Sequence, residues 1–265
     1  MKDIAVIPND TRDIDLAETK KVVEILHGYG AEVRMEQILR TADAAVVLGG
    51  DGTILGVAAK AAVHGVPILG INLGNLGFLA QAEKGDYSVF KSLFDGDYSV
   101  TSCMMLDAVI VKQGVEGKRC LALNDMVVTA CGSSRMITVS AAVNGTNIGS
   151  YPADGLIVAT AVGSTAYSLS AGGAVLHPDL DAMIITPVCP HTLRARSTVI
   201  PGNDEIWLSP ARPRRSEMML LADGKPVDVL KDGEFIKITK AKYRTRLIKP
   251  RNRNFFDVLR EKLAD

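Results

Sequence analysis

The strongest constraint on the fold is an alternation of apolar runs and helical patterns over about the first ninety residues. Three short apolar runs, at 4–8, 44–48 and 67–71, are typical of buried strands. Residues 15–29 and 54–63 between them have the apolar spacing or the small side chains of helices. This strand–helix order predicts a parallel α/β layer, with functional loops at the carboxyl ends of its strands.

The pattern changes near residues 95–101 (DGDYSVT), where helical periodicity gives way to short strand-like runs. Turn pairs separate several of these runs: Asn144-Gly145, Asp223-Gly224 and Asp232-Gly233. Residues 164–175 are the exception, rich enough in small side chains to form a loop that leads into a close-packed helix. The amphipathic tail, 255–263, is predicted as a terminal helix.

We therefore predict a two-domain chain. The N-terminal domain is α/β, with a Rossmann-like parallel sheet; it covers 1–97 and is completed by a C-terminal helix within 250–265. The second domain is β-rich and covers 98–249.

Composition narrows the functional classes. Thirty basic and thirty acidic side chains cancel, so neither nucleic acid nor an anionic membrane is an expected partner. The chain shows neither an apolar run of the roughly 20 residues that span a bilayer nor a secretory signal pattern. Its four widely spaced cysteines suit free thiols in a reducing compartment, and we expect a cytoplasmic protein.

The run VVLGGDGTILG is the first candidate for chemistry. Glycines directly after a buried strand let the backbone approach phosphate oxygens, and a helix start near Thr53 offers free N–H donors. Asp51 would then lie beside a phosphate site, where its carboxylate can accept a proton from an attacking hydroxyl. A tight glycine turn capped by an aspartate is the alternative. The chain has neither the P-loop pattern nor the GxGxxG dinucleotide fingerprint.

Three further segments are candidates. GINLGNLGFLA, residues 70–80, is either a connecting loop or a second wall of the site, with Phe78 as an apolar face for a base. Asn124-Asp125 suits hydrogen bonding to ribose hydroxyls or a carboxamide, although alone it is an ordinary turn. Residues 150–178 combine glycines with hydroxyl side chains and one exposed-looking Tyr167, a composition that suits a crevice for a polar ligand.

These segments resemble the NAD kinase family, of the bacterial and archaeal type, across nearly the whole chain. The resemblance rests on GGDGT at 49–53, NLGFL at 75–79, the ND pair at 124–125, and DGLIVAT…GSTAYSLSAGG at 154–173. GGDGT is shared with lipid kinases and phosphofructokinases, whereas GSTAYSLSAGG is far more specific. The resemblance implies transfer of a phosphoryl group from a nucleoside triphosphate such as ATP, or from polyphosphate, to the 2′-hydroxyl of the adenosine ribose of NAD.

The resemblance also implies residue roles. Asp51 would be the proton acceptor, and the phosphate loop would comprise Gly49, Gly50, Gly52 and Thr53. NAD would contact Gly52, Phe78, Asn124, Asp125, Arg135, Asp154, Thr165, Ala166, Tyr167, Ser168 and Ser170. A divalent cation, Mg²⁺ by preference, is expected to neutralise the transferred group, with no protein metal ligand predicted. A homodimer or homotetramer is expected.

The chain departs from the family pattern at three places, of which the last two concern donor contacts and the choice between NAD and NADH. The chain has Ala161-Val162 where TPxGSTAY is frequent, Pro152 where some members are basic, and Lys225 where many have glutamine. Two rival functions are kept: a lipid or sphingoid-base kinase, which has no use for STAYSLSAGG, and a catalytically silent NAD-binding regulator, which has no need of Asp51.

Overall fold

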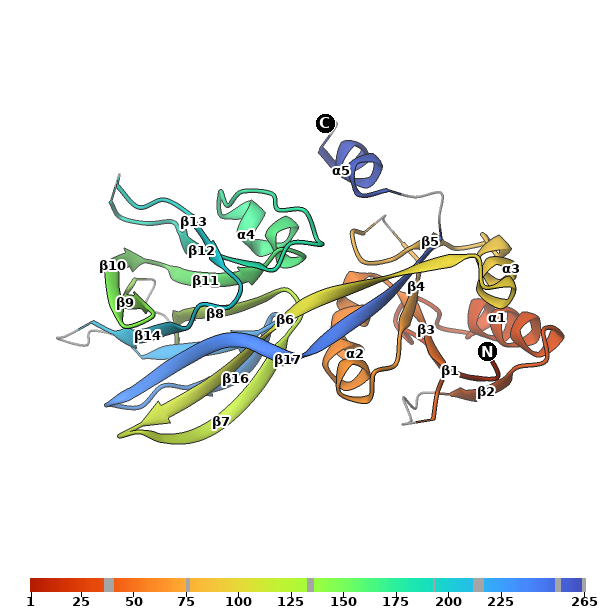
Figure 1. Cartoon of the computed structure of the whole chain (residues 1–265), viewed down its shortest axis with the longest axis horizontal. Helices are drawn as coiled ribbons and strands as arrows, with labels where there is room; N and C mark the ends of the chain where they lie inside the picture. The colour runs from red at the N-terminus through yellow and green to blue at the C-terminus, as the bar shows by residue number, and fades with distance from the viewer. Residues whose placement is uncertain are drawn as a thin grey trace. The chain divides into compact units, whose positions relative to one another are not determined.

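A computed structural model of the chain describes residues 1–35, 41–74, 77–132, 136–192, 194–211, 217–250 and 254–263. The chain separates into two compact units: Met1–Cys103 with Tyr243–Asp265, and Met104–Lys242. The expected architecture of two domains rich in sheet is thus present (Figure 1).

The first unit contains a parallel arrangement of strands with helices on both faces (Figure 1). Its strand order is β4-β3-β1-β2, with β5 parallel to β4. The elements are β1 Asp3–Ile7, α1 Ala17–Gly28, β2 Glu32–Met35, β3 Ala44–Gly49, α2 Asp51–His64, β4 Ile68–Asn72, β5 Ala82–Glu83 and α3 Ser88–Asp95. The strands and helices expected at 4–8, 15–29, 44–48, 54–63 and 67–71 are confirmed within a few residues, whereas β2 and α3 were not predicted.

Burial explains why β3 and β4 have continuous apolar sequences. Every residue of both strands is buried, because α1 and α3 pack on one face while α2 contacts the other. Val22 of α1 and Phe90 of α3 share a core with alternate strand residues such as Val46 and Leu48. Ile54 of α2 lies so close to Gly70 that a Cβ there would be 2.5 Å from its Cδ1.

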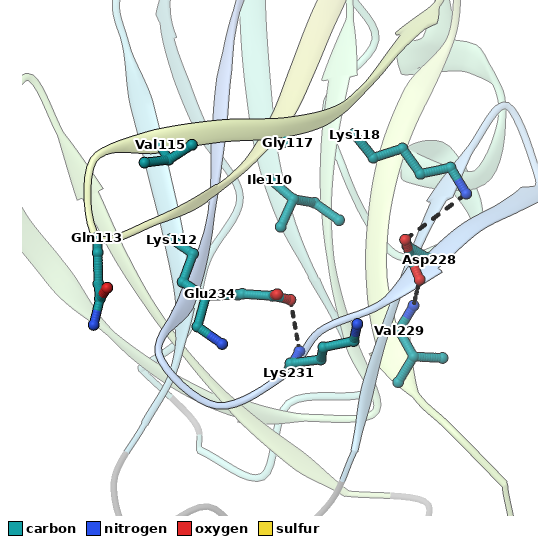
Figure 2. A pocket seen from close by; sticks show the side chains of 10 residues that line it. All are labelled: Ile110, Lys112, Gln113, Val115, Gly117, Lys118, Asp228, Val229, Lys231 and Glu234. Carbon is teal, nitrogen blue, oxygen red and sulfur yellow. Dashed lines mark hydrogen bonds and ion pairs between the residues drawn. The ribbon is translucent and has the colours of Figure 1, made fainter.

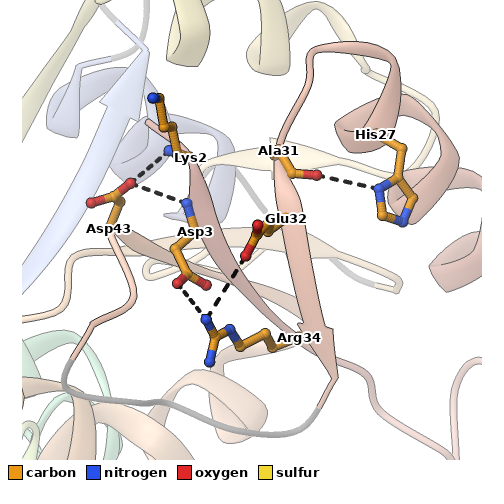
Figure 3. A network of polar contacts seen from close by, with 7 residues as sticks. All are labelled: Lys2, Asp3, His27, Ala31, Glu32, Arg34 and Asp43. Atoms are coloured by element: carbon orange, nitrogen blue, oxygen red, sulfur yellow. Dashed lines mark hydrogen bonds and ion pairs between the residues drawn. The ribbon is translucent and has the colours of Figure 1, made fainter.

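Polar contacts fix the start of β1 beside the entry to β3 (Figure 3). The Asp43 carboxylate accepts hydrogen bonds from the backbone N–H groups of Lys2 and Asp3, at 2.6 and 3.1 Å, and these bonds lower its pKa. Arg34 of β2 pairs with Asp3 at 2.8 Å. The pairs are partly exposed, so we assign them to register more than to stability.

The second unit consists of antiparallel strands in two sheets. One contains β10-β9-β14-β17 with β6 and β7, and the other has the order β13-β12-β11-β8-β15-β16. Their bounds are β6 Tyr98–Lys112, β7 Val115–Ala122, β8 Asp125–Ala130, β9 Ile137–Val143, β10 Thr146–Ala153, β11 Gly155–Thr160, β12 Ala182–Val188, β13 Thr198–Pro201, β14 Ile206–Pro210, β15 Met218–Ala222, β16 Lys225–Val229 and β17 Glu234–Pro250. The strands β6 and β17 run from one unit into the other along the chain.

The six-stranded sheet is covered on both faces, which positions the third and fourth candidate segments. Leu156 and Val158 of β11 point into the core shared by the two sheets, and Ile157 and Ala159 into a smaller cluster with Leu176. The segment after β11 therefore packs on the outer face. It holds a 3-10 turn, η1 Gly163–Thr165, and a four-residue helix, α4 Tyr167–Ser170, so the loop leading into a helix that was expected within 164–175 is present.

The predicted terminal helix forms as α5 Phe255–Leu263, and none of its side chains is buried. None of the described helices is long and apolar enough to cross a membrane.

Candidate active site

The glycine turn between β3 and α2 is built by side chains from outside the motif. A Cβ at Gly49 would lie 2.2 Å from the Oγ1 of Thr53, so the turn requires glycine there. The same Thr53 hydroxyl accepts a hydrogen bond of 2.6 Å from the Asn9 amide, which ties the loop after β1 to the first turn of α2. Two strand ends thus meet at the start of one helix, where backbone N–H groups have no partner within the helix.

Asp51, the first residue of α2, is held by the loop that follows β4. Its Oδ2 accepts a 2.8 Å hydrogen bond from the N–H of Phe78, and its Oδ1 accepts bonds from Leu79 at 3.1 Å and Ala80 at 3.3 Å. A Cβ at Gly77 would lie 2.0 Å from Oδ1, so this close approach requires glycine. The described part of the NLGFL segment therefore positions the Asp51 carboxylate.

These bonds leave chemical capacity on Asp51. A carboxylate offers about four acceptor positions, and the loop uses three N–H donors, with only one of them on Oδ2. Asp51 is half-buried, so the remaining position on Oδ2 is available to a hydroxyl of a bound substrate. A fixed, accessible carboxylate is the arrangement that general base catalysis requires.

Gly52 differs from its neighbours in the motif. A Cβ there would meet nothing within 4 Å, and the residue is exposed. Glycine inside a helix lowers stability by about 1 kcal/mol relative to alanine, so glycine at position 52 does not stabilise the described fold. Open space at a helix start, kept free of a side chain, suits close approach of a phosphate.

Arg12 is a candidate that the sequence reasoning missed. A Cβ at Gly74 would lie 2.3 Å, and one at Gly50 3.1 Å, from its Nη1, so the guanidinium rests against both glycines. Arg12 is exposed, and within the described residues its guanidinium forms no ion pair or hydrogen bond. The loop that carries it is fixed by the Asn9 side chain, which accepts the Arg12 N–H at 3.1 Å. A lone arginine in a loop carries no motif, so only proximity reveals it.

In the second unit, Asn124 and Asp125 form a buried turn before β8. Asp125 is 5% exposed, and its pKa is raised to about 7 by burial and then by the neighbouring Asp223 charge. The Oδ1 of Asn124 is buried and has no hydrogen-bond partner within the described part of the chain. The Asp125 carboxyl oxygens likewise receive no hydrogen bond from described residues. Buried polar groups without partners are rare, and a ligand is one source of the missing bonds.

The GST segment packs directly against this turn. A Cβ at Gly163 would lie 2.1 Å from the carbonyl oxygen of Asn124, so glycine is required there. Thr160 strengthens the contact, since its N–H donates to the Asn124 carbonyl at 2.8 Å and its hydroxyl to the Leu123 carbonyl at 2.6 Å. The structure thus brings together the third and fourth candidate segments through residues that lie 36 to 39 positions apart in the chain.

The hydroxyl groups of the fourth segment have different surroundings. Ser168 is fully buried, and its hydroxyl lies 2.8 Å from that of Thr186. The Thr165 hydroxyl donates to the Val162 carbonyl at 3.1 Å, whereas Ser170 is exposed and Ala166 half-buried. Internal hydrogen bonds thus account for two of the hydroxyls, and the predicted contacts of these residues with NAD stay predictions.

Tyr167 is the exposed residue of this segment, at 46%. Burial of part of its ring raises the pKa of its phenol, and the charges of Cys189, Asp154 and Asp125 act in the same direction. Two other predicted NAD-binding residues, Asp125 and Asp154, thus lie within electrostatic range of Tyr167. Arg135, Asn75 and Leu76 lie outside the described residues.

A cavity of about 380 Å³ lies elsewhere in the second unit, beside the hairpin of β6 and β7 (Figure 2). Its charged lining is partly paired, with Lys118 3.8 Å from Asp228 and the Lys231 N–H donating to Glu234 at 2.7 Å. None of the residues that line it was predicted for the site. The clustered candidate side chains, not this cavity, identify the site.

Comparison with known proteins assigns these features to one family. The model of the ATP-NAD kinase N-terminal domain matches residues 8–98, and that of the ATP-NAD kinase C-terminal domain matches residues 123–250. The NAD kinase of Caldanaerobacter subterraneus subsp. tengcongensis is 41% identical, with all of both chains covered. That of Heliobacterium modesticaldum is 43% identical over 92% of this chain and 85% of its own. The chain belongs to the NAD kinase family.

Solved structures share the fold. An NAD kinase from Archaeoglobus fulgidus in complex with ATP matches with a TM-score of 0.80 and 30% identity, covering 97% of this chain and 98% of its own. Yeast NADH kinase complexed with NADH matches with a TM-score of 0.87, covering 100% of this chain and 88% of its own. At 21% identity, the yeast likeness concerns the fold alone.

Proposed function

We propose that this chain is an NAD kinase, which transfers a phosphoryl group from ATP or another phosphoryl donor to the 2′-hydroxyl of the adenosine ribose of NAD and so forms NADP. Membership of the family supports the assignment. The observation that carries it is the Asp51 carboxylate, held by three backbone N–H groups at the start of α2 with an acceptor position left open.

The proposed chemistry uses Asp51 as the general base. Its Oδ2 accepts the proton of the 2′-hydroxyl as that oxygen forms a bond to the terminal phosphorus of the donor. The bond from this phosphorus to the bridging oxygen breaks, and the nucleoside diphosphate leaves with its electron pair. Positioning and charge stabilisation supply most of the rate in such transfers. We assign the phosphates to Gly49, Gly50, Gly52 and Thr53, with Arg12 as an additional positive charge.

NAD binding is proposed for the predicted set. Asn124 and Asp125 offer buried polar groups that lack partners in the described fold. Tyr167 lies in electrostatic range of both Asp125 and Asp154. The remaining proposed contacts are Gly52, Phe78, Arg135, Thr165, Ala166, Ser168 and Ser170. Within α4, Tyr167 and Ser170 are the exposed members of the proposed set.

A divalent cation is proposed as part of the substrate. The described residues contain no group of three or more His, Cys, Asp or Glu side chains placed to hold a metal ion. We propose that Mg²⁺ arrives on the triphosphate and neutralises its charge, as in other phosphoryl transfers. We further propose that the protein is a cytoplasmic homodimer or homotetramer. We also propose that the parallel sheet of the first unit is Rossmann-like, and that the domains are 1–97 with 250–265, and 98–249.

The test is an assay of NADP formation by purified protein with NAD, Mg²⁺ and either ATP or polyphosphate. We expect NADP with at least one donor, and we expect Asp51→Asn to lower kcat about 100- to 10,000-fold while the dissociation constant for NAD stays within about threefold. Asp95→Asn, an exposed carboxylate on α3 of the same unit, is the matched control and should stay fully active.

Two results would count against the proposal. If no donor yields NADP while a sphingoid base or diacylglycerol is phosphorylated, the lipid kinase alternative holds. If the protein binds NAD but phosphorylates nothing, it is the silent regulator. Full activity of Asp51→Asn would reject Asp51 as the base without touching the family assignment.

A further inference from the structure

The Asp223-Gly224 turn has more contacts than a hairpin needs. It joins β15 to β16 through two residues, and both have positive φ angles, 47° and 75°, as a tight hairpin of this kind requires. Aspartate and glycine satisfy that geometry alone. The Asp223 side chain nevertheless points away from its own hairpin and toward the turn before β8.

The Asp223 carboxylate binds three consecutive backbone N–H groups. Its Oδ2 accepts from Leu123 at 2.8 Å, and its Oδ1 accepts from Asn124 at 2.7 Å and Asp125 at 3.1 Å. The contact is reciprocal, because the Asp223 N–H donates to the Asp125 carbonyl at 3.0 Å. Hydrogen bonds to a charged acceptor are about twice as strong as neutral ones, so this set fixes the path of residues 123–125.

That turn carries the two polar side chains that lack partners. Asn124 is 8% exposed, and its buried Oδ1 has no partner within the described residues, while Asp125 is 5% exposed. Without the Asp223 carboxylate, three buried N–H groups would lose their acceptors, and the direction of both side chains would relax.

We propose that Asp223 is a positioning residue of the NAD site, which orients Asn124 and Asp125 through their backbone and keeps Asp125 able to donate a hydrogen bond to the ligand. This inference rests on the proposed function. In this assignment Asp223 acts through the backbone of residues 123–125, and the ligand contacts belong to the side chains of Asn124 and Asp125.

The two carboxyl groups divide the charge between them. Burial raises the pKa of both, but the three N–H groups and Lys225 act against that rise at Asp223. Asp125 has no such bonds, and the Asp223 charge raises its pKa further, to about 7. The pair therefore places the negative charge on Asp223 and the proton on Asp125. The titratable groups in electrostatic range of the pair are Lys225 and Cys120 for Asp223, and Tyr167 for Asp125.

The experiment compares Asp223→Asn with the wild type by calorimetric titration of NAD without a phosphoryl donor, over a pH series. Asparagine tolerates the same positive φ. Its amide has one acceptor oxygen and one donor NH₂, so at least one of the three backbone N–H groups would face a donor and lose its hydrogen bond. We expect the dissociation constant for NAD to rise roughly tenfold and its pH inflection to move to lower pH, since the Asp223 charge no longer opposes ionisation of Asp125. In the kinase assay, KM for NAD should rise, with kcat within about threefold of the wild type.

The matched control is Asp228→Asn, an exposed carboxylate on β16 of the same hairpin, which should leave both quantities unchanged. A folded Asp223→Asn protein with wild-type affinity and the same pH inflection would overturn the inference. Asp51→Asn separates the two proposals, because it should lose turnover while it keeps the pH dependence of NAD binding. A wild type that binds no NAD would overturn the proposed function and this inference with it.

Should Asp223→Asn fail to fold, hydrogen exchange of the wild type decides. We expect the amides of Leu123, Asn124 and Asp125 to be protected before NAD is added, because Asp223 holds them in the free protein. Free exchange of these amides that becomes slow only with NAD would overturn the inference.

Discussion

Asp51 and Asp223 each accept three backbone N–H groups, but they lie in different surroundings. Asp51 is half-buried at the start of a helix, and the bonds come from a loop that follows the neighbouring strand. Asp223 lies in a hairpin turn next to a second carboxyl group, that of the buried Asp125. The same arrangement thus fixes a proposed reacting group directly in one unit and, through the backbone, orients proposed ligand-binding groups in the other.

The difference lies in which side chain is assigned to the ligand. At Asp51 the proposed ligand contact is the held carboxylate itself, whereas at Asp223 the proposed contacts are side chains of the turn that the carboxylate holds. Loss of the holding contacts should therefore lower turnover in the first unit and NAD affinity in the second. Four changes sharpen or break this contrast.

Gly77→Ala should have the largest effect. The added Cβ would lie 2.0 Å from Oδ1 of Asp51, so the loop or the carboxylate must shift. A displacement of about 1 Å at a reacting group costs roughly 100-fold in rate. We expect kcat to fall by about that factor while NAD binding measured by titration is kept. Unchanged kcat would show that the loop contacts do not position the base.

Asp125→Asn tests the buried pair through pH. A carboxyl with its pKa raised to about 7 keeps its proton in the folded state after the unfolded chain has lost it. The folded state then binds more protons, so the free energy of unfolding falls as pH rises toward about 7. We expect the wild type to lose roughly 1 kcal/mol more per pH unit than Asp125→Asn, which does not titrate.

Urea denaturation of both proteins from about pH 5 to about pH 8 measures this difference. The gap between them should widen toward pH 7 and then stay constant. Parallel curves across the whole range would show that Asp125 is charged in the folded protein.

Gly52→Ala separates stability from function at one position. Nothing lies within 4 Å of the added Cβ, and alanine is favoured over glycine in a helix, so stability should be equal or higher by up to about 1 kcal/mol. The methyl group would occupy the space assigned to a phosphate, so KM for the donor should rise roughly tenfold or more. Thermal melts and donor titrations measure both effects.

Gly28→Ala is the matched control, because it ends α1 and likewise has nothing within 4 Å. It should share the stability effect without the change in KM. A fully active Gly52→Ala enzyme would argue against close phosphate approach at the start of α2.

Arg12→Ala should have the smallest effect. Removal of one exposed cation near the glycines should raise KM for the phosphoryl donor by about tenfold at low salt, with a smaller effect at high salt. The matched control is Arg34→Ala, an arginine of the same unit that pairs with Asp3. Steady-state kinetics at two salt concentrations tests this, and an unchanged KM would remove Arg12 from the phosphate site.

The sequence by itself predicted the local elements of the first unit and the glycine turn at Asp51, because strand burial, helix periodicity and glycine placement are written in neighbouring residues. It predicted the β-rich second half and a loop leading into a helix after Gly163, but it did not give the length of that helix, since small side chains serve an irregular packed segment as well as a helix. It missed β2 and α3, both short and weakly marked.

Only the tertiary structure decided what holds the candidate side chains. The donors to Asp51 follow it by 27 to 29 residues, and those to Asp223 precede it by 98 to 100. Such partners depend on which strands become neighbours, and no local pattern specifies that pairing. The sequence therefore identified Asp51 as a carboxylate among glycines. The fold determined that the loop after β4, whose close approach Gly77 permits, orients this carboxylate.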